Sequence, residues 1–336
     1  MNKQAFVSSV LGEFSQTPAT EIASAFAPTN IALCKYWGKR DVELNLPVTP
    51  SLSLTLPEKG TTTALTVIDK AQDEIVLNGE TLANDTPFSR RIVDFLDLFR
   101  KASLHFHIDT RNNMPSSAGL ASSASGFAAL VDALNSLFGW HLEDRQLSLL
   151  ARLGSGSACR SFWQGFVEWH RGEQADGLDS YAEPISTIWP ELRLGVLILD
   201  DRVKPIGSRK AMLRCQKTSC YYPAWPDKVD RDLKTLKQAI QSKDFESLAE
   251  TSENNALAMH ALMFTAMPPI SYWTPATQEV MQKVWWLRQE GLPVYFTQDA
   301  GPNIKLLFEE KHTAALKEHF PQLDVVVPFL QREVDR

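Results

Sequence analysis

Asp299 lies in the segment TQDAGPN, between two short apolar runs that predict strands. A carboxylate held in such a turn can align a substrate hydroxyl and take its proton. Aspartate beside glycine and proline is also a frequent turn former. The local pattern therefore leaves a catalytic and a structural role open.

Two other segments carry the cations and hydroxyls that an anionic substrate requires. The run APTNIALCKYWGKR contains Lys35, Tyr36 and Lys39, and lysine supplies a point charge while tyrosine supplies a hydroxyl donor. The run GSGSACR ends in Arg160, whose planar fork suits a carboxylate or a phosphate. Taken alone, a solvated basic loop would explain the first run, and a turn with an exposed arginine would explain the second.

The run PSSAGLASSA, residues 115–124, is rich in small side chains and leads into a predicted helix over 118–137. Small residues allow the backbone to approach a phosphate, and a helix N-terminus offers free N–H groups and a positive dipole end. Ser122 and Ser123 add hydroxyls that can bind phosphate or Mg²⁺. A small-residue helix packed on a sheet explains the same pattern equally well.

Hydrophobic periodicity predicts the elements that must position these residues. Apolar residues alternate in LHFHID, residues 104–109, which predicts a half-buried strand whose two histidines face outward. The run LRLGVLILD, 192–200, predicts another strand, followed by a polar, basic loop over 201–214. A helix is predicted around Val229, Leu233, Leu236 and Ile240, which recur at helical spacing.

The last third of the chain alternates helix and strand patterns. A helix is predicted over 276–290, ended by a glycine and a proline, and strands over 294–296 and 304–308. This order favours an α+β sandwich. We place a domain boundary between residues 193 and 194, which gives an N-terminal domain over 1–193 and a C-terminal domain over 194–336.

The composition is that of a globular protein. At about 150 residues per domain, 336 residues suggest two domains. The net charge of −6 disfavours a general nucleic-acid binder, and the longest strongly apolar run is too short to cross a membrane. The four cysteines form no C-x-x-C pair, so we expect free, mostly buried thiols and a cytoplasmic location.

Several motifs, in the same order, resemble one enzyme family. PSSAGLASSA is similar to the phosphate motif of the GHMP kinase superfamily, and KYWGKRD, GSGSACRS and DAGPN together resemble its mevalonate diphosphate decarboxylase family. The likeness continues in LNLPVTPSLSLTL, ENNALAMHA and YFTQDAGPNIKLL, and it covers about residues 22–310. It implies an α+β, GHMP kinase-like fold, with an N-terminal ribosomal-protein-S5-like domain and a C-terminal ferredoxin-like domain.

The resemblance also implies a reaction and a set of site residues. Members convert (R)-5-diphosphomevalonate and ATP, with Mg²⁺, to isopentenyl diphosphate, ADP, phosphate and CO₂, and they are often homodimers. The implied catalytic residues are Asp299, Lys35 and Arg160. The implied substrate-binding residues are Tyr36, Trp37, Gly38, Lys39, Ser155, Gly156, Ser157, Ala158, Cys159, Arg160, Ser208 and Arg209. The implied ATP-binding residues are Pro115, Ser116, Gly119, Leu120, Ala121, Ser122 and Ser123, with Ser122 also beside the Mg²⁺.

Some positions depart from the family pattern. Glu80 follows LNG, where many members carry a basic residue that reaches the substrate phosphate, and Gly207 begins the stretch that is Ser-Ser-Arg in the family. These changes leave open whether the substrate carries a 5-diphosphate or a 5-phosphate. The alternatives are a phosphomevalonate decarboxylase, a mevalonate 3-kinase, and a catalytically silent metabolite sensor, which the intact Asp299 disfavours.

Overall fold

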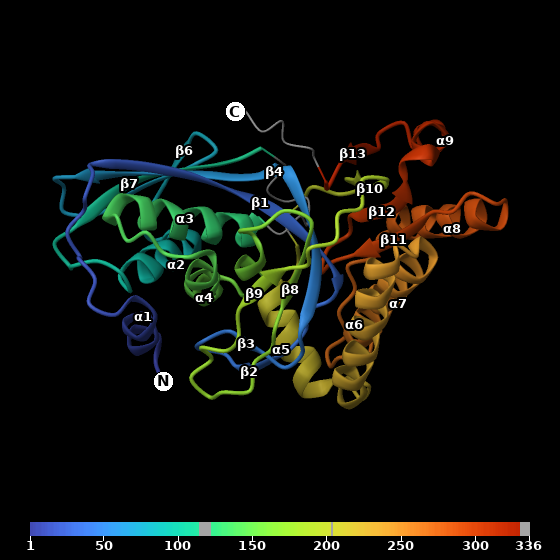
Figure 1. Cartoon of the computed structure of the whole chain (residues 1–336), viewed down its shortest axis with the longest axis horizontal. Helices are drawn as coiled ribbons and strands as arrows, with labels where there is room; N and C mark the ends of the chain where they lie inside the picture. Colours follow the sequence, from blue (N-terminus) through green and yellow to red (C-terminus); the bar gives the residue numbers. More distant parts are fainter. Residues whose placement is uncertain (114–121, 203, 330–336) are drawn as a thin grey trace.

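The computed structural model describes residues 1–113, 122–202 and 204–329 (Figure 1). In these ranges the largest sheet has seven strands in the order β6-β5-β7-β4-β8-β9, with β1 paired to β4 outside this path. A second sheet has the order β11-β12-β10-β13, and β2 and β3 form a small ribbon. The strands of the largest sheet are β1 (Ile22–Cys34), β4 (Ser51–Ile68), β5 (Glu74–Leu77), β6 (Glu80–Leu82), β7 (His105–Asn112), β8 (Phe166–Trp169) and β9 (Ala182–Pro184). The remaining strands are β2 (Lys39–Asp41), β3 (Leu46–Pro47), β10 (Leu192–Leu197), β11 (Tyr295–Gln298), β12 (Ile304–Glu309) and β13 (Asp324–Val326).

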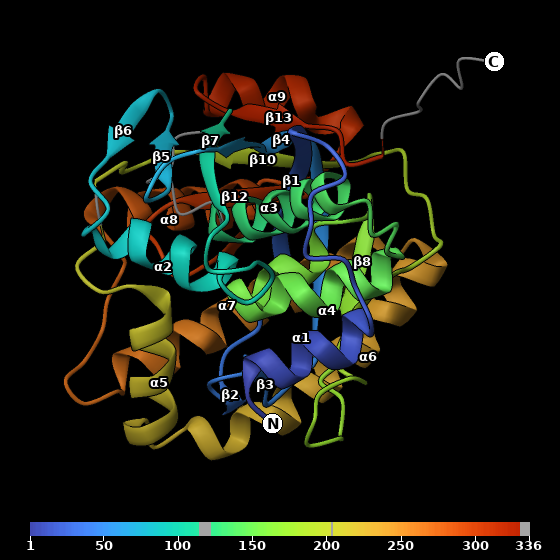
Figure 2. The same cartoon turned by 90° about the vertical axis from the view of Figure 1, so that its left-hand side faces the viewer.

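The helices form two groups, which Figures 1 and 2 show on opposite sides of the long strands β1 and β4. The first group contains α1 (Lys3–Leu11), α2 (Pro87–Leu96), α3 (Ser122–Phe138) and α4 (Asp144–Gly154), followed by the short 3₁₀ helix η1 (Gly156–Arg160). The second contains α5 (Ser208–Thr218), η2 (Tyr222–Ala224), α6 (Trp225–Ser242), α7 (Phe245–Phe264) and α8 (Pro275–Gln289). The chain then continues through η3 (Glu310–His312) and α9 (Thr313–His319).

The two sheets share one apolar core. Ile31 and Leu52 of the large sheet belong to the same buried cluster as Leu194 of β10 and Val229 and Leu236 of α6. Each of these side chains is almost completely removed from water, so separating the sheets would expose a large apolar area. The two halves therefore stabilise each other, and the loops between them are held in place.

Most predicted elements are present. Phe106 and Ile108 of β7 are buried while His105 and His107 are only partly buried, which confirms the half-buried strand. The helical spacing that begins at Val229 corresponds to α6, and α8, β11 and β12 match the predicted helix and strands of the C-terminal part. Helix α3 matches the described part of the predicted helix over 118–137.

The basic loop predicted over 201–214 is only partly a loop. Helix α5 begins at Ser208, because Ala211, Met212 and Cys215 give the sequence a buried apolar face despite its many charges. The domain boundary stays a prediction, and β10, which begins at Leu192, spans the predicted position. Three cysteines are buried and free and Cys220 is exposed, as expected for mostly buried thiols.

Candidate active site

Asp299 lies between two buried lysines where the two sheets meet. Its Oδ1 atom is 2.8 Å from Lys35 Nζ, and its Oδ2 atom is 3.4 Å from Lys305 Nζ. Lys35 directly follows β1, while Asp299 and Lys305 lie at the facing ends of β11 and β12. The fold thus brings together Lys35 and Asp299, which are 264 positions apart.

Each charged group of this centre stabilises the charged form of its partner. Burial alone would raise the pKa of the Asp299 carboxyl, but Lys35 and Lys305 outweigh burial and hold that pKa well below its usual range. Burial lowers the pKa of the Lys35 ammonium, and Asp299 opposes this effect. Asp299 is therefore an ionised acceptor. Its side chain keeps 23% of its surface exposed, while its Oδ2 atom is buried.

His260 of α7 fixes the backbone of Asp299. Its Nε2 atom donates to the Asp299 carbonyl oxygen at 3.2 Å, and the Gly301 backbone N–H donates to the same oxygen at 2.8 Å. Burial, and then Lys35, lower the pKa of His260 to about 3, so the ring is neutral. His260 and Lys305 were not among the predicted site residues. Lys305, a lysine within the apolar run IKLLF, was a signal that sequence reasoning could have used.

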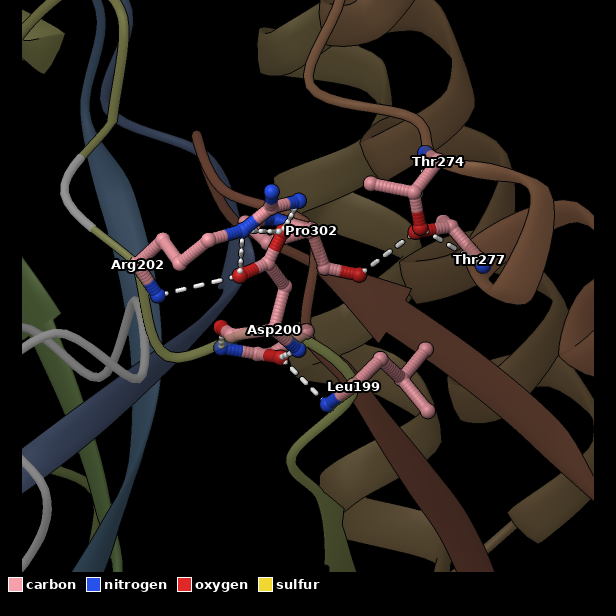
Figure 3. A network of polar contacts seen from close by, with 7 residues as sticks. Leu199, Asp200, Arg202, Thr274, Thr277 and Pro302 are labelled. Atoms are coloured by element: carbon pink, nitrogen blue, oxygen red, sulfur yellow. Dashed lines mark hydrogen bonds and ion pairs between the residues drawn. The ribbon is translucent and has the colours of Figure 1, made fainter.

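The end of the DAGPN turn is fastened to its surroundings (Figure 3). The Asn303 side-chain oxygen accepts from the backbone N–H groups of Leu199 and Asp200, at 2.6 and 3.0 Å. Thr277 at the start of α8 donates through Oγ1 to the Pro302 carbonyl oxygen at 2.9 Å. These bonds tie the turn to β10 and α8 and so restrict where Asp299 can point.

Arg160 is held in the core at the end of η1. Its Nε and Nη2 atoms donate to Asn30 Oδ1 at 3.3 and 3.2 Å, and Nη1 donates to the Ser51 hydroxyl. Only 2% of Arg160 is exposed, so the guanidinium plane is fixed by the protein. The alternative explanation of this motif, a turn with an exposed arginine, does not hold, because strands β1 and β4 supply buried oxygen partners.

Tyr36 lies beside the backbone of η1. A Cβ atom on Gly156 would meet the Tyr36 ring at 2.7 Å, so the close approach requires glycine. Within the described part of the chain the buried Tyr36 hydroxyl has no hydrogen-bond partner. Ser155 directly precedes Gly156. Its hydroxyl oxygen lies 3.2 Å from that of Ser123 and 3.5 Å from that of Ser157.

Other predicted substrate-binding residues have packing roles. Trp37, Ala158 and Cys159 are buried. Gly38 has φ +127°, and a Cβ atom there would overlap the hydroxyl of Tyr222, which donates to the Trp37 carbonyl oxygen at 3.2 Å. The structure therefore uses these positions to shape the backbone around Tyr36.

Lys39 and Arg209 lie at a second, basic part of the site. Lys39 is 6% exposed and donates through Nζ to Asn45 Oδ1. Ser208 and Arg209 form the first turn of α5, and Arg209 lines a cavity of about 360 Å³ together with Gly154. Because Gly154 directly precedes Ser155, this cavity adjoins the segment around Tyr36.

The structure describes only the last part of the predicted phosphate loop, residues 115–123. Pro115, Ser116, Gly119, Leu120 and Ala121 lie outside the described residues. Ser122 begins α3, and Ser123 contacts Ser155 as described above. In the described ranges no three His, Cys, Asp or Glu side chains are grouped to hold a metal ion.

The fold and the Asp299 centre define a two-domain α+β enzyme of the GHMP kinase type, as predicted from the sequence. Residues 27–182 match the model of the diphosphomevalonate decarboxylase-like N-terminal domain, and residues 194–332 match that of the mevalonate 5-diphosphate decarboxylase C-terminal domain. The diphosphomevalonate decarboxylase of Candida albicans is 36% identical over 319 residues, which cover 89% of this chain and 88% of that protein.

Solved structures agree. The mevalonate diphosphate decarboxylase from Enterococcus faecalis has a TM-score of 0.83 and 39% identity, covering 92% of this chain and 97% of that chain. A structure described as MDDEF in complex with MVAPP, AMPPCP and magnesium has a TM-score of 0.84 and 40% identity, covering 92% of this chain and 98% of that one. The chain therefore belongs to the diphosphomevalonate decarboxylase family.

Proposed function

We propose that this chain catalyses the ATP-dependent decarboxylation of (R)-5-diphosphomevalonate to isopentenyl diphosphate, with ADP, phosphate and CO₂ as the other products. The observation that carries the proposal is the ionised Asp299 carboxylate, held between Lys35 and Lys305 with part of its side-chain surface exposed. Related proteins over most of the chain are named diphosphomevalonate decarboxylases, which supports the same reaction.

The first step is transfer of the γ-phosphoryl group of ATP to the C3 hydroxyl. Phosphoryl transfer passes through a loose transition state, so alignment of the hydroxyl contributes more than its early deprotonation. The low pKa of Asp299 makes it a weak base but a strong hydrogen-bond acceptor. We assign it the role of orienting the hydroxyl and receiving its proton late, while the ammonium of Lys35 offsets the accumulating negative charge.

The second step is loss of phosphate and CO₂. The C3–O bond breaks with its electron pair on phosphate, and the C1–C2 bonding pair forms the C2=C3 double bond as CO₂ leaves. We assign Tyr36 and Arg160 to substrate binding, as the family resemblance implies. The guanidinium plane of Arg160, fixed by Asn30 and Ser51, has the geometry that suits a carboxylate such as C1. No electron-sink cofactor is required, because ATP supplies the leaving group.

Mg²⁺ would accompany ATP in this reaction. Such an ion usually takes its oxygen ligands from the nucleotide phosphates, from water and from one or two protein side chains. The N-terminus of α3, a helix of 17 residues, would supply backbone N–H groups to the phosphates. The family resemblance assigns Ser122 a place beside the ion. When bound, the ion neutralises phosphate charge.

Incubation with Mg-ATP and either mevalonate, its 5-phosphate or its 5-diphosphate tests the proposal. We expect CO₂ and ADP in equal amounts, with the 5-diphosphate as the best substrate. ADP without CO₂ would identify a kinase instead. The alternative of a 5-phosphate decarboxylase rests on Glu80, which is exposed on β6 where many family members carry a basic residue.

Three expectations stay predictions, namely the domain boundary at 193/194, a homodimer and a cytoplasmic location. Of the helices in the described ranges, none is long and apolar enough to cross a membrane.

A further inference from the structure

Helices α1 and α2 bring two more cations to the basic cavity. Lys3 and Arg91 line it together with Arg209, and Lys39 is close enough for these three charges to affect it. Lys39 and Arg209 were predicted as site residues from the sequence, whereas Lys3 and Arg91 were not. In the ranges described, none of the four forms an ion pair with a carboxylate.

The protein holds Lys3 and Arg91 in place. Helix α1 starts at Lys3, the Asn2 side chain caps it by accepting from Ala5 N at 2.8 Å, and the buried Phe6 anchors it to the core. Arg91 donates through Nη2 to the Gly154 carbonyl oxygen at 2.6 Å and lies 4.7 Å above the ring of Phe127. The two cations thus project from fixed backbone, with Lys3 partly buried and Arg91 exposed.

The cluster carries excess positive charge. Burial and the neighbouring charges of Arg209, Arg91 and Lys3 lower the pKa of Lys39 to about 7. Burial and Arg209 lower the pKa of Arg91 to about 10. The pKa of Lys3 is also lowered, by burial and by Arg209, although the carboxylates of Glu43 and Asp94 act to raise it. A bound anion would offset this repulsion. Because Lys3, Arg91 and Arg209 line one cavity, it offers cations to more than one phosphate group.

We propose that Lys3 and Arg91 are specificity-determining residues, which together with Lys39 and Arg209 bind the terminal phosphate of a diphosphate-bearing substrate. This inference rests on the proposed function and deepens it. The residues that line the cavity include cations from α1 and α2 and do not include Glu80, so this diphosphate site does not depend on a basic residue after LNG. Arginine binds phosphate through two parallel N–H groups, which suits Arg91 to the terminal group.

The test compares wild type with Lys3→Met and Arg91→Met, and with Lys101→Met as a control for loss of an exposed positive charge outside the cavity. Steady-state kinetics are measured with the 5-diphosphate and the 5-phosphate. A charge-assisted hydrogen bond corresponds to about 10–100-fold in affinity. We expect KM for the 5-diphosphate to rise by about that factor in each cavity variant, with kcat and KM for the 5-phosphate changing much less.

Binding of inorganic diphosphate, measured by calorimetry, separates this inference from the proposed function. Weaker binding in both cavity variants but not in Lys101→Met supports the pocket, even if wild type forms no CO₂. Unchanged KM and unchanged diphosphate binding in variants of normal melting temperature would overturn the inference while leaving the decarboxylase proposal intact. An equal rise of KM for both substrates would also overturn it, because the terminal phosphate would then not be the group recognised.

Discussion

The replacement Asp299→Asn removes the counter-ion of two buried ammonium groups. In the wild type Lys35 and Lys305 share one carboxylate, and both lysines are almost fully buried. Asparagine keeps the size and one oxygen but has no charge. Loss of one partner of a buried ion pair typically lowers the free energy of unfolding by about 3–5 kcal/mol.

The chain can limit this loss by releasing a proton from Lys35. Keeping a lysine neutral costs about 1.36 kcal/mol for each pH unit below its ordinary pKa of 10.5. This cost is ~5 kcal/mol at pH 7 and ~2 kcal/mol at pH 9. The destabilisation should therefore be largest near neutral pH and should decrease as the pH rises. Asp299 itself does not contribute to this trend, because its pKa is below 3.8 and it stays ionised throughout.

Thermal unfolding at pH 7 and pH 9 measures the effect. The shared core makes one transition for the whole chain the expected behaviour. With an unfolding entropy of ~2.1 cal/mol/K per residue over 336 residues, a loss of ~3–5 kcal/mol lowers the Tm by ~4–7 °C at pH 7. Turnover should fall by about 10²–10⁴-fold. Asp69→Asn, at an exposed position, is the control and should leave both quantities unchanged. A Tm that is unchanged or higher, or a loss that does not shrink at pH 9, would refute the counter-ion role.

Three further substitutions test other parts of the site. Ser122→Ala should raise KM for ATP or slow phosphoryl transfer, whereas unchanged kinetics with a lower Tm would indicate only a lost helix cap. Arg160→Lys should lower turnover while the protein still folds, because lysine keeps the positive charge but lacks the planar guanidinium that binds Asn30. Normal turnover in this variant would show that the guanidinium is not required. The pKa of Lys39 is lowered to about 7, so its charge is present below pH 7 and is lost above it. The advantage of wild type over Lys39→Met in binding inorganic diphosphate should therefore shrink about ten-fold between pH 6 and pH 8, and a constant advantage would contradict this.

Local patterns predicted those parts of the fold that depend on periodicity. The alternation around Phe106 and the helical spacing from Val229 each correspond to an element with the expected buried face. The start of α5 was missed because charged residues and a preceding glycine and proline conceal a short apolar face at Ala211 and Cys215. Such a face is specified by its packing partner, which is distant in sequence.

Site residues that belong to a sequence motif could be predicted, whereas residues that join the site only through long-range contacts could not. Asp299 and Lys35 were recognised from their motifs, but their ion pair depends on two sheets meeting. Lys305 stands out in the sequence only as a lysine within an apolar run, and Lys3 carries no motif, because a single lysine at a helix start has many ordinary explanations. Only the folded chain places the first against Asp299 and the second at the basic cavity.

The position of α1 has a practical consequence for producing the protein. Its first residue lines the basic cavity, and Asn2 caps the helix through its side chain. An affinity tag fused ahead of Met1 would join the chain two residues before Lys3, which lines this cavity. A polyhistidine or acidic tag could then occupy the cavity or block access to it. Purification tags therefore belong at the other end of the chain, or should be cleaved before affinities for anionic ligands are measured.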